Sequence, residues 1–147
     1  MDSLSKLPER LKELMFYHGE IKSEALAAKI GVYGSSVRAW MNGKSLISLN
    51  NAIKLADFFS CSLDYLAGLR DTYEEVKAKP CPEFYERLRN VMIEKNISRY
   101  EIVKKTEIPD VYFTKWSRGA VPDLISIIKI AKHLDVSLDY LVGRTDY

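Results

Sequence analysis

The chain has 147 residues, of which 47% are hydrophobic and 29% charged, and its formal net charge at pH 7 is +2. This length and composition fit one ordinary globular domain or two small ones. No apolar run approaches the roughly 20 residues of a membrane-spanning helix, and the N-terminus lacks the apolar core of a signal peptide. We therefore expect a cytoplasmic protein with no membrane partner.

The cysteines and histidines indicate neither a disulfide nor a metal site. Cys61 and Cys81 form no CxxC motif, and a reducing compartment keeps them as thiols. His18 and His133 have no cysteine or carboxylate at ligand spacing. Nucleophile–base pairs, paired carboxylates and phosphate-binding glycine loops are also absent from the sequence. We predict no metal, no cofactor and no enzymatic activity.

The first half of the chain has the pattern of five helices. A first helix is expected at about residues 8–18, and two short amphipathic helices within residues 23–44. Ser48 is the expected N-cap of a fourth helix. Ser62 is the expected N-cap of a short fifth helix, which ends at Gly68 because glycine favours helix C-termini.

The stretch 23–44 has the residue spacing of a helix-turn-helix motif. Apolar residues recur on one face of each short segment, at Leu26, Ala27, Ile30, Val32, Val37, Trp40 and Met41. Gly31 separates the two segments, and glycine can end one helix and redirect the chain into the next. In such a motif the second helix is free to lie in the major groove of DNA. The same spacing also fits a plain helical hairpin.

The second half of the chain repeats the first. Four segments recur in the same order: 10–15 as 87–92, 40–43 as 116–119, 53–56 as 128–131 and 62–68 as 137–143. The second set of helices is therefore expected at about 82–95, 98–106, 109–118, 123–134 and 137–141. No segment alternates in hydrophobicity at period two, so we predict an all-α protein without a sheet.

This repeat predicts two five-helix domains, at residues 1–68 and 82–147, joined by a linker at residues 69–81. The predicted linker, LRDTYEEVKAKPC, is charged, contains Pro80 and has no sustained apolar face. Alternatively, residues 72–77 extend helical structure and hold the two copies rigidly.

Both copies resemble the Cro/C1-type helix-turn-helix domain of phage repressors, also called the XRE family. The most specific matches are residues 26–32, Val37 and Trp40 with Asn42-Gly43-Lys44, and residues 62–68. The resemblance covers nearly the whole chain outside the predicted linker. It implies a lambda repressor-like five-helix bundle in each copy, with a third helix that contacts the DNA major groove. It further implies a sequence-specific transcriptional regulator of a bacterium or phage, whose partner is double-stranded DNA.

Nine residues of the first copy are candidate DNA contacts, and all but Tyr33 are implied by the resemblance. They are Lys22, Ser23, Tyr33, Gly34, Ser35, Ser36, Arg38, Asn42 and Lys44. Arg38 has the greatest reach, because a guanidinium donates two hydrogen bonds to guanine O6 and N7 or pairs with a phosphate. Lys22 is expected at a phosphate, and Asn42 and Lys44 at the DNA backbone. Tyr33 either contacts a phosphate through its hydroxyl or covers the turn.

The remaining candidates of the first copy have short side chains. Ser35 and Ser36 either contact DNA or cap the third helix, because serine oxygen accepts hydrogen bonds from free amides at a helix start. The family often has longer polar residues at the positions of Ser23, Gly34 and Ala39. This copy is therefore expected to contact few bases directly and to depend on backbone contacts and DNA shape.

The second copy departs further from the family pattern. Glu107 stands where the turn glycine is expected, Val103 replaces the small Ala27, and Asp110 places an unfavourable negative charge opposite phosphate. Its candidate DNA contacts are Ser98, Arg99, Tyr112, Thr114, Lys115 and Arg118. Residues 76–147 nevertheless have 13 Lys and Arg against 10 Asp and Glu, whereas residues 1–75 have 9 against 10. The charge and the motif of the second copy therefore point in opposite directions.

Two interpretations of the second copy remain open at the level of sequence. It is either a less specific DNA-binding module, or a former DNA-binding module that now forms a homodimer through Val111 and Tyr112. For the whole chain, the alternative function is a protein-interaction module such as an antirepressor or antitoxin. Trp40 and Trp116 lie on apolar faces and are predicted to be core residues rather than base-stacking ones.

Overall fold

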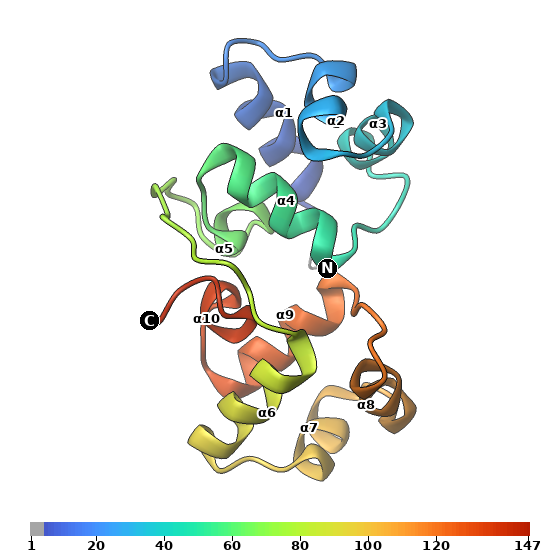
Figure 1. Ribbon diagram of the computed structural model, residues 1–147, viewed down its shortest axis with the longest axis vertical. Helices are drawn as coiled ribbons and strands as arrows, with labels where there is room; N and C mark the ends of the chain where they lie inside the picture. The colour runs from blue at the N-terminus through green and yellow to red at the C-terminus, as the bar shows by residue number, and fades with distance from the viewer. Residues whose placement is uncertain (1–4) are drawn as a thin grey trace. The chain divides into compact units, whose positions relative to one another are not determined.

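The computed structural model describes residues 5–147, which form ten helices and no strand (Figure 1). These residues divide into two compact units, of which the first ends at Val76 and the second begins at Lys77. The first unit contains α1 (Leu7–Tyr17), α2 (Ser23–Ile30), α3 (Gly34–Met41), α4 (Leu49–Phe59) and α5 (Leu63–Leu66). The second contains α6 (Phe84–Lys95), α7 (Arg99–Thr106), α8 (Asp110–Ser117), α9 (Leu124–Leu134) and α10 (Leu138–Val142). The predicted all-α fold with two five-helix units is confirmed.

Each unit has a hydrophobic core to which all of its five helices contribute. In the first unit, fully buried residues include Leu11, Leu26, Val37, Leu55 and Leu66. Burying a side chain of this size stabilises the fold by about 1.5–3 kcal/mol. The α2–α3 pair depends on this core, because neither eight-residue helix is long enough to be stable alone.

The two tryptophans are core residues, as predicted. Trp40 is 3% exposed and Trp116 is 4% exposed. Trp116 packs edge-to-face on Phe84 at a ring-centroid distance of 5.7 Å, and it also contacts Phe113 at 5.0 Å. Both indole rings therefore anchor the third helix of their unit to its core and are unavailable for base stacking.

Side-chain caps fix where several helices begin. Ser48 Oγ accepts a hydrogen bond from Asn51 N–H at 3.2 Å, and Ser62 Oγ accepts one from Tyr65 N–H at 2.9 Å, as predicted. In the second unit, Asp123 caps α9 and Ser137 caps α10 in the same way. Each cap satisfies an amide that the helix itself leaves free, which stabilises the helix start by about 1 kcal/mol.

An arginine of the first helix joins it to the fifth helix in both units. The Arg10 guanidinium lies 4.2 Å from the centroid of the Tyr65 ring and donates to Tyr65 O at 2.9 Å. The Arg87 guanidinium lies 4.5 Å from the Tyr140 ring and donates to Tyr140 O at 3.1 and 2.7 Å. The sequence repeat at these arginines therefore has a structural origin.

The turn between the second and third helices has the same backbone conformation in both units. Gly31 ends α2 with φ +76°, and its N–H donates to Ala27 O. Glu107 ends α7 with φ +62°, and its N–H donates to Val103 O. A side chain in this left-handed conformation is strained by roughly 1–2 kcal/mol, so the tertiary contacts of the second unit tolerate a glutamate where the first unit has glycine. Thr106 assists this turn, because its hydroxyl accepts a hydrogen bond from Ile108 N–H.

The segment between α5 and α6 contains no helix. Residues 72–77 therefore do not form the helical extension that was the alternative to a linker. The segment is tied to the unit on each side: Val76 N–H donates to Ser60 O at 2.9 Å in the first, and Lys79 N–H donates to Arg144 O at 3.0 Å in the second. Lys79 also forms an ion pair with Asp146. In the part of the chain that the structure describes, no helix is long and apolar enough to cross a membrane.

Candidate nucleic-acid interface

The helix α3 buries one face and exposes the other. Val37 and Trp40 are buried in the core, while Ser35 and Arg38 lie on the exposed face of the helix. Tyr33, the N-cap of α3, has an extended backbone and a side chain that is 81% exposed. The predicted contact surface is therefore accessible along α3 and the turn before it.

Ser35 and Ser36 do not cap α3. The N-cap is Tyr33, no side chain caps this helix, and the two serines are its second and third residues. Ser35 is exposed and Ser36 is half-buried. The capping alternative for these residues is wrong, because the helix begins earlier than a serine cap requires. The side chains of both serines remain candidates for contact with DNA.

An acidic residue that the sequence analysis did not single out lies over the start of α3. The Glu24 carboxylate of α2 forms an ion pair with the Arg38 guanidinium. It also covers Gly34, where an added Cβ would lie 2.1 Å from Glu24 Oε1. Gly34 is therefore buried under this ion pair, and Arg38 is partly neutralised. No periodic pattern in the sequence links Glu24 to Arg38, which lies 14 residues later.

The other basic candidates of the first unit have free charges. Lys22 and Lys44 are exposed, and neither forms an ion pair with any of residues 5–147. The main chain past α3 is held in place, because Lys44 N–H donates to Ala39 O at 2.9 Å and Asn42 N–H to Arg38 O at 3.1 Å. Lys22 and Lys44 thus lie at the two ends of the α2–α3 motif with charges available to an anion such as phosphate.

The starts of the second helix differ between the units. No side chain caps α2, whose N-cap is Lys22 and whose first residue is Ser23. In contrast, Ser98 caps α7, and its Oγ accepts a hydrogen bond from Glu101 N–H at 3.1 Å. The first-turn amides of α2 are therefore freer to bind a phosphate than those of α7.

In the second unit, Arg99 is engaged by its own domain. Its Nε donates to Asp110 Oδ1 at 2.8 Å, and its Nη2 donates to Asp110 Oδ2 at 3.1 Å. Nη2 also donates to Asp110 O at 2.8 Å and to Thr114 Oγ1 at 2.9 Å. The pair neutralises Asp110, the residue expected to repel phosphate, and leaves Arg99 and Thr114 with partners inside the domain.

The exposed part of α8 combines apolar and basic side chains. Val111 is 51% exposed and Tyr112 is 36% exposed. Lys115 Nζ lies 5.9 Å from the Tyr112 ring centroid, and Lys115 and Arg118 form no ion pair within residues 5–147. Lys115 and Arg118 are therefore the candidate DNA contacts of this unit whose charges are free.

Two family models match the chain. The model described as a helix-turn-helix matches residues 19–66, and the model described as a Cro/C1-type HTH DNA-binding domain matches residues 87–146. The chain consists of two tandem Cro/C1-type helix-turn-helix domains. No curated protein and no solved structure matches it.

Both matches contain the predicted interface of their domain. Residues 19–66 include all of α2 and α3, and residues 87–146 include all of α7 and α8. Cro/C1-type domains bind DNA and are typically non-enzymatic, so the chain is a DNA-binding regulator at the level of its family. What each domain contacts depends on the residues that it presents.

The histidines are not as isolated as their sequence spacing suggested. In the second Cro/C1-type domain, His133 Nε2 lies 2.7 Å from Glu101 Oε2. In the first, the His18 ring packs against Phe58 at 4.7 Å and Phe59 at 5.6 Å. Within residues 5–147, no group of three or more His, Cys, Asp or Glu side chains is arranged to hold a metal ion.

Proposed function

We propose that the protein is a sequence-specific transcriptional repressor of bacterial or phage type, and that α3 of its first domain lies in the DNA major groove. The observation that carries this proposal is the exposed Arg38 on α3, flanked by the free charges of Lys22 and Lys44. An arginine between two phosphate-binding lysines supplies both base recognition and positioning on the duplex.

The Glu24–Arg38 ion pair does not prevent this contact. Both side chains are more than half exposed, and an exposed ion pair contributes at most about 1 kcal/mol. A bidentate contact between arginine and guanine discriminates against other bases by about 1–3 kcal/mol. Replacing Glu24 by a guanine as the partner of Arg38 is therefore favourable. At a non-specific site the new contact is weaker, so the replacement is less favourable. In this proposal, the ion pair favours specific over non-specific DNA.

The other residues of the first domain are assigned supporting roles. Lys22 and Lys44 bind phosphates, and the exposed Asn42 contacts the backbone just past the end of α3. The exposed Tyr33 places its hydroxyl at the start of α3, where it donates to a phosphate. Ser23, Ser35 and Ser36 contribute short-range polar contacts, and Gly34 lies beneath Glu24 without a side chain of its own.

The second domain is assigned a weaker and less specific DNA contact through Lys115 and Arg118. Its internal Arg99–Asp110 ion pair leaves α8 without a free long polar side chain in its first turn. Because the domains are tethered, even a weak second contact increases the affinity of the whole chain. The exposed Val111 and Tyr112 favour a second candidate role for this domain, which is self-association into a homodimer.

The test is selection of binding sites from a random DNA pool with the full chain, at several salt concentrations. We expect one enriched motif that the chain bearing Arg38→Ala no longer discriminates, and a steep salt dependence. The matched variant is Thr114→Ala, at the corresponding position of α8, which should leave the motif unchanged. Absence of any enriched motif would contradict the proposal and favour a protein partner. Dimer formation that Tyr112→Ser abolishes would support the self-association role of the second domain.

A further inference from the structure

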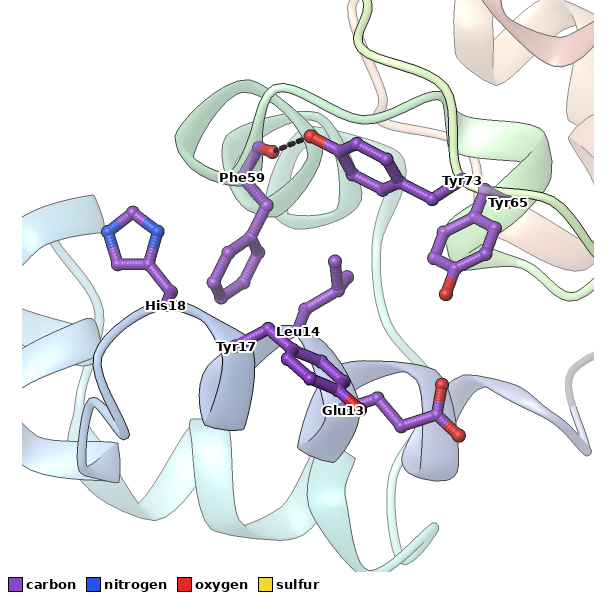
Figure 2. A pocket seen from close by; sticks show the side chains of 7 residues that line it. All are labelled: Glu13, Leu14, Tyr17, His18, Phe59, Tyr65 and Tyr73. Carbon is purple, nitrogen blue, oxygen red and sulfur yellow. Dashed lines mark hydrogen bonds between the residues drawn. The ribbon is translucent and has the colours of Figure 1, made fainter.

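The first domain contains an aromatic cleft of about 400 Å³ that takes no part in the proposed DNA contact. Its lining consists of Glu13, Leu14, Tyr17, His18, Phe59, Tyr65 and Tyr73 (Figure 2). These residues belong to α1, α4, α5 and the segments that follow α1 and α5, and none belongs to α2 or α3. The cleft is therefore a separate feature of the same domain.

The segment after α5 forms one wall of the aromatic cleft. The Tyr73 hydroxyl donates to Phe59 O at 3.2 Å and to Ser60 O at 3.3 Å. Its ring meets the Tyr65 ring edge-to-face at a centroid distance of 5.8 Å (Figure 2). Burial is the main cause that raises the pKa of Tyr73 above its ordinary value of 10.0. A tyrosine phenol is protonated at neutral pH with or without such a shift. The Tyr73 side chain is thus uncharged, and contacts of both its hydroxyl and its ring hold it in place.

The charge at the aromatic cleft is negative. Glu13 extends along the α1 side of the cleft, beside Tyr17 (Figure 2), and no cation among residues 5–147 forms an ion pair with it. One of these rings, that of Tyr65, has the Arg10 guanidinium over it. This guanidinium is already satisfied by Tyr65 O, Arg70 O and the Asp71 carboxylate. Within residues 5–147, Arg10 thus lies over the Tyr65 ring alone, and Glu13 has no cationic partner.

We propose that this cleft binds a small organic cation, namely an amine or quaternary ammonium group that carries apolar substituents. Tyrosine and phenylalanine rings attract cations through the negative electrostatic potential of their faces, and groups of such rings bind quaternary ammonium ions. Glu13 adds a direct Coulomb attraction. A neutral molecule of the same shape has only the apolar contacts, and an anion is repelled by Glu13.

The second domain provides an internal comparison, because its corresponding positions do not form such a site. Tyr17 corresponds to Glu94, whose carboxylate accepts a hydrogen bond from the Tyr140 hydroxyl at 2.6 Å. Phe59 corresponds to Leu134, and Glu13 to Asn90. The rings of Tyr17 and Phe59 and the free carboxylate of Glu13 are therefore particular to the first domain. They are not required by the fold that the two domains share.

The experiment is a nuclear magnetic resonance titration of the full chain with choline and with 3,3-dimethylbutan-1-ol, its uncharged carbon isostere. We expect choline to shift the amide resonances of the end of α1, of Phe59 and of Tyr73, and to leave those of the second domain unchanged. The alcohol should bind about 10-fold more weakly, because it lacks the cation–π and Coulomb contributions. Equal binding of the two probes, or no shifts at the cleft with choline, would overturn the proposal.

Two variants assign the binding to the aromatic cleft. Glu13→Gln should weaken choline binding about 5-fold and leave binding of the alcohol unchanged, because it removes only the charge. The matched control is Glu9→Gln, which makes the same change of charge on α1 outside the cleft and should have no effect on either probe. Tyr17 is 86% exposed, so Tyr17→Leu should preserve the fold while it weakens choline binding. An unchanged choline affinity in both Glu13→Gln and Tyr17→Leu would overturn the assignment. None of these outcomes depends on DNA binding.

Discussion

The third helices of the two domains, α3 and α8, occupy the same place in the fold. In the ion pairs at their surfaces, however, the acid and the base have exchanged helices. In the first domain the acid is on the second helix and the base on the third, as Glu24 and Arg38. In the second domain the base is on the second helix and the acid on the third, as Arg99 and Asp110. The third helix that would face DNA therefore carries the basic member of the ion pair in the first domain and the acidic member in the second.

This difference shows that a repeated fold is compatible with divergent surfaces. The core residues, the caps of the fourth and fifth helices and the arginine that joins the first helix to the fifth recur in both domains, because they hold the bundle together. The exposed residues of α3 and α8 are not needed for packing and are free to differ. The comparison between the two helices is thus a comparison of function. Five experiments, three on DNA binding and two on stability, test the differences between the domains.

The largest effect is expected from Arg38→Ala. It should weaken specific DNA binding by about 1–3 kcal/mol, because it removes the side chain proposed to contact a guanine. Thr114→Ala, at the same position of α8, should change binding by much less. Fluorescence anisotropy with the selected site and a scrambled site measures both. Equal losses in the two variants would remove the functional distinction between α3 and α8.

Substitutions at the turn between the second and third helices should change the free energies of unfolding of the two domains in opposite directions. Gly31→Ala should destabilise the first domain by about 1 kcal/mol, because alanine is strained at φ +76°. Glu107→Gly should stabilise the second by about 0.5–1 kcal/mol, since the relief of strain exceeds the added entropy of the unfolded chain. Chemical denaturation followed by circular dichroism measures both free energies of unfolding. A destabilised Glu107→Gly variant would indicate that the glutamate side chain has a compensating contact.

The salt dependence of binding distinguishes the phosphate contacts of the two domains. Lys44→Ala should weaken binding to all DNA sequences similarly and reduce the salt slope by about one unit, because one fewer counterion is released. Lys115→Ala should reduce the slope by less, because the proposed contact of the second domain with DNA is weaker. The measurement is anisotropy across a series of potassium chloride concentrations. A larger slope change for Lys115→Ala would make the second domain the main electrostatic contact.

The ion pairs themselves are tested by removing their acids. Glu24→Gln should strengthen non-specific DNA binding about 3-fold and lower the discrimination between sites, because Arg38 no longer has an internal partner. Asp110→Asn should strengthen binding through the second domain, since it releases Arg99 and removes a negative charge from α8. Comparing specific with non-specific affinity for each variant gives the result. If Glu24→Gln leaves both affinities unchanged, the ion pair has no role in recognition.

The smallest effect concerns alkaline pH. A hydrogen bond to Glu94 is the main cause that raises the pKa of Tyr140 above 10.0. A tyrosine whose pKa is raised by folding stabilises the protein below its unfolded pKa and loses that stabilisation as the pH rises through its folded pKa. Tyr140→Phe should therefore flatten the fall in unfolding free energy above pH 10. An unchanged pH profile would show that the Tyr140–Glu94 contact does not persist in solution.

The helices, the repeat and the family follow from the amino-acid sequence. Apolar periodicity, serine caps and glycine turns are local signals, and each depends on residues within four positions of one another. Leu26, Val37 and Trp40 lie on the apolar faces that the spacing predicts, and the structure buries all three. The division between Val76 and Lys77 lies within the stretch predicted as a linker, where the charged composition left no apolar face.

Which charges are free depends on the packing of the helices and could not be predicted from the sequence. Glu24 and Arg38 are 14 residues apart, Arg99 and Asp110 are 11 apart, and Glu101 and His133 are 32 apart. No local pattern connects such residues, because their contact depends on how separate helices pack. The aromatic cleft likewise needs Tyr17, Phe59 and Tyr73, which lie on three different segments. A side chain's residue type follows from the sequence, but its partner depends on the packing of the folded chain.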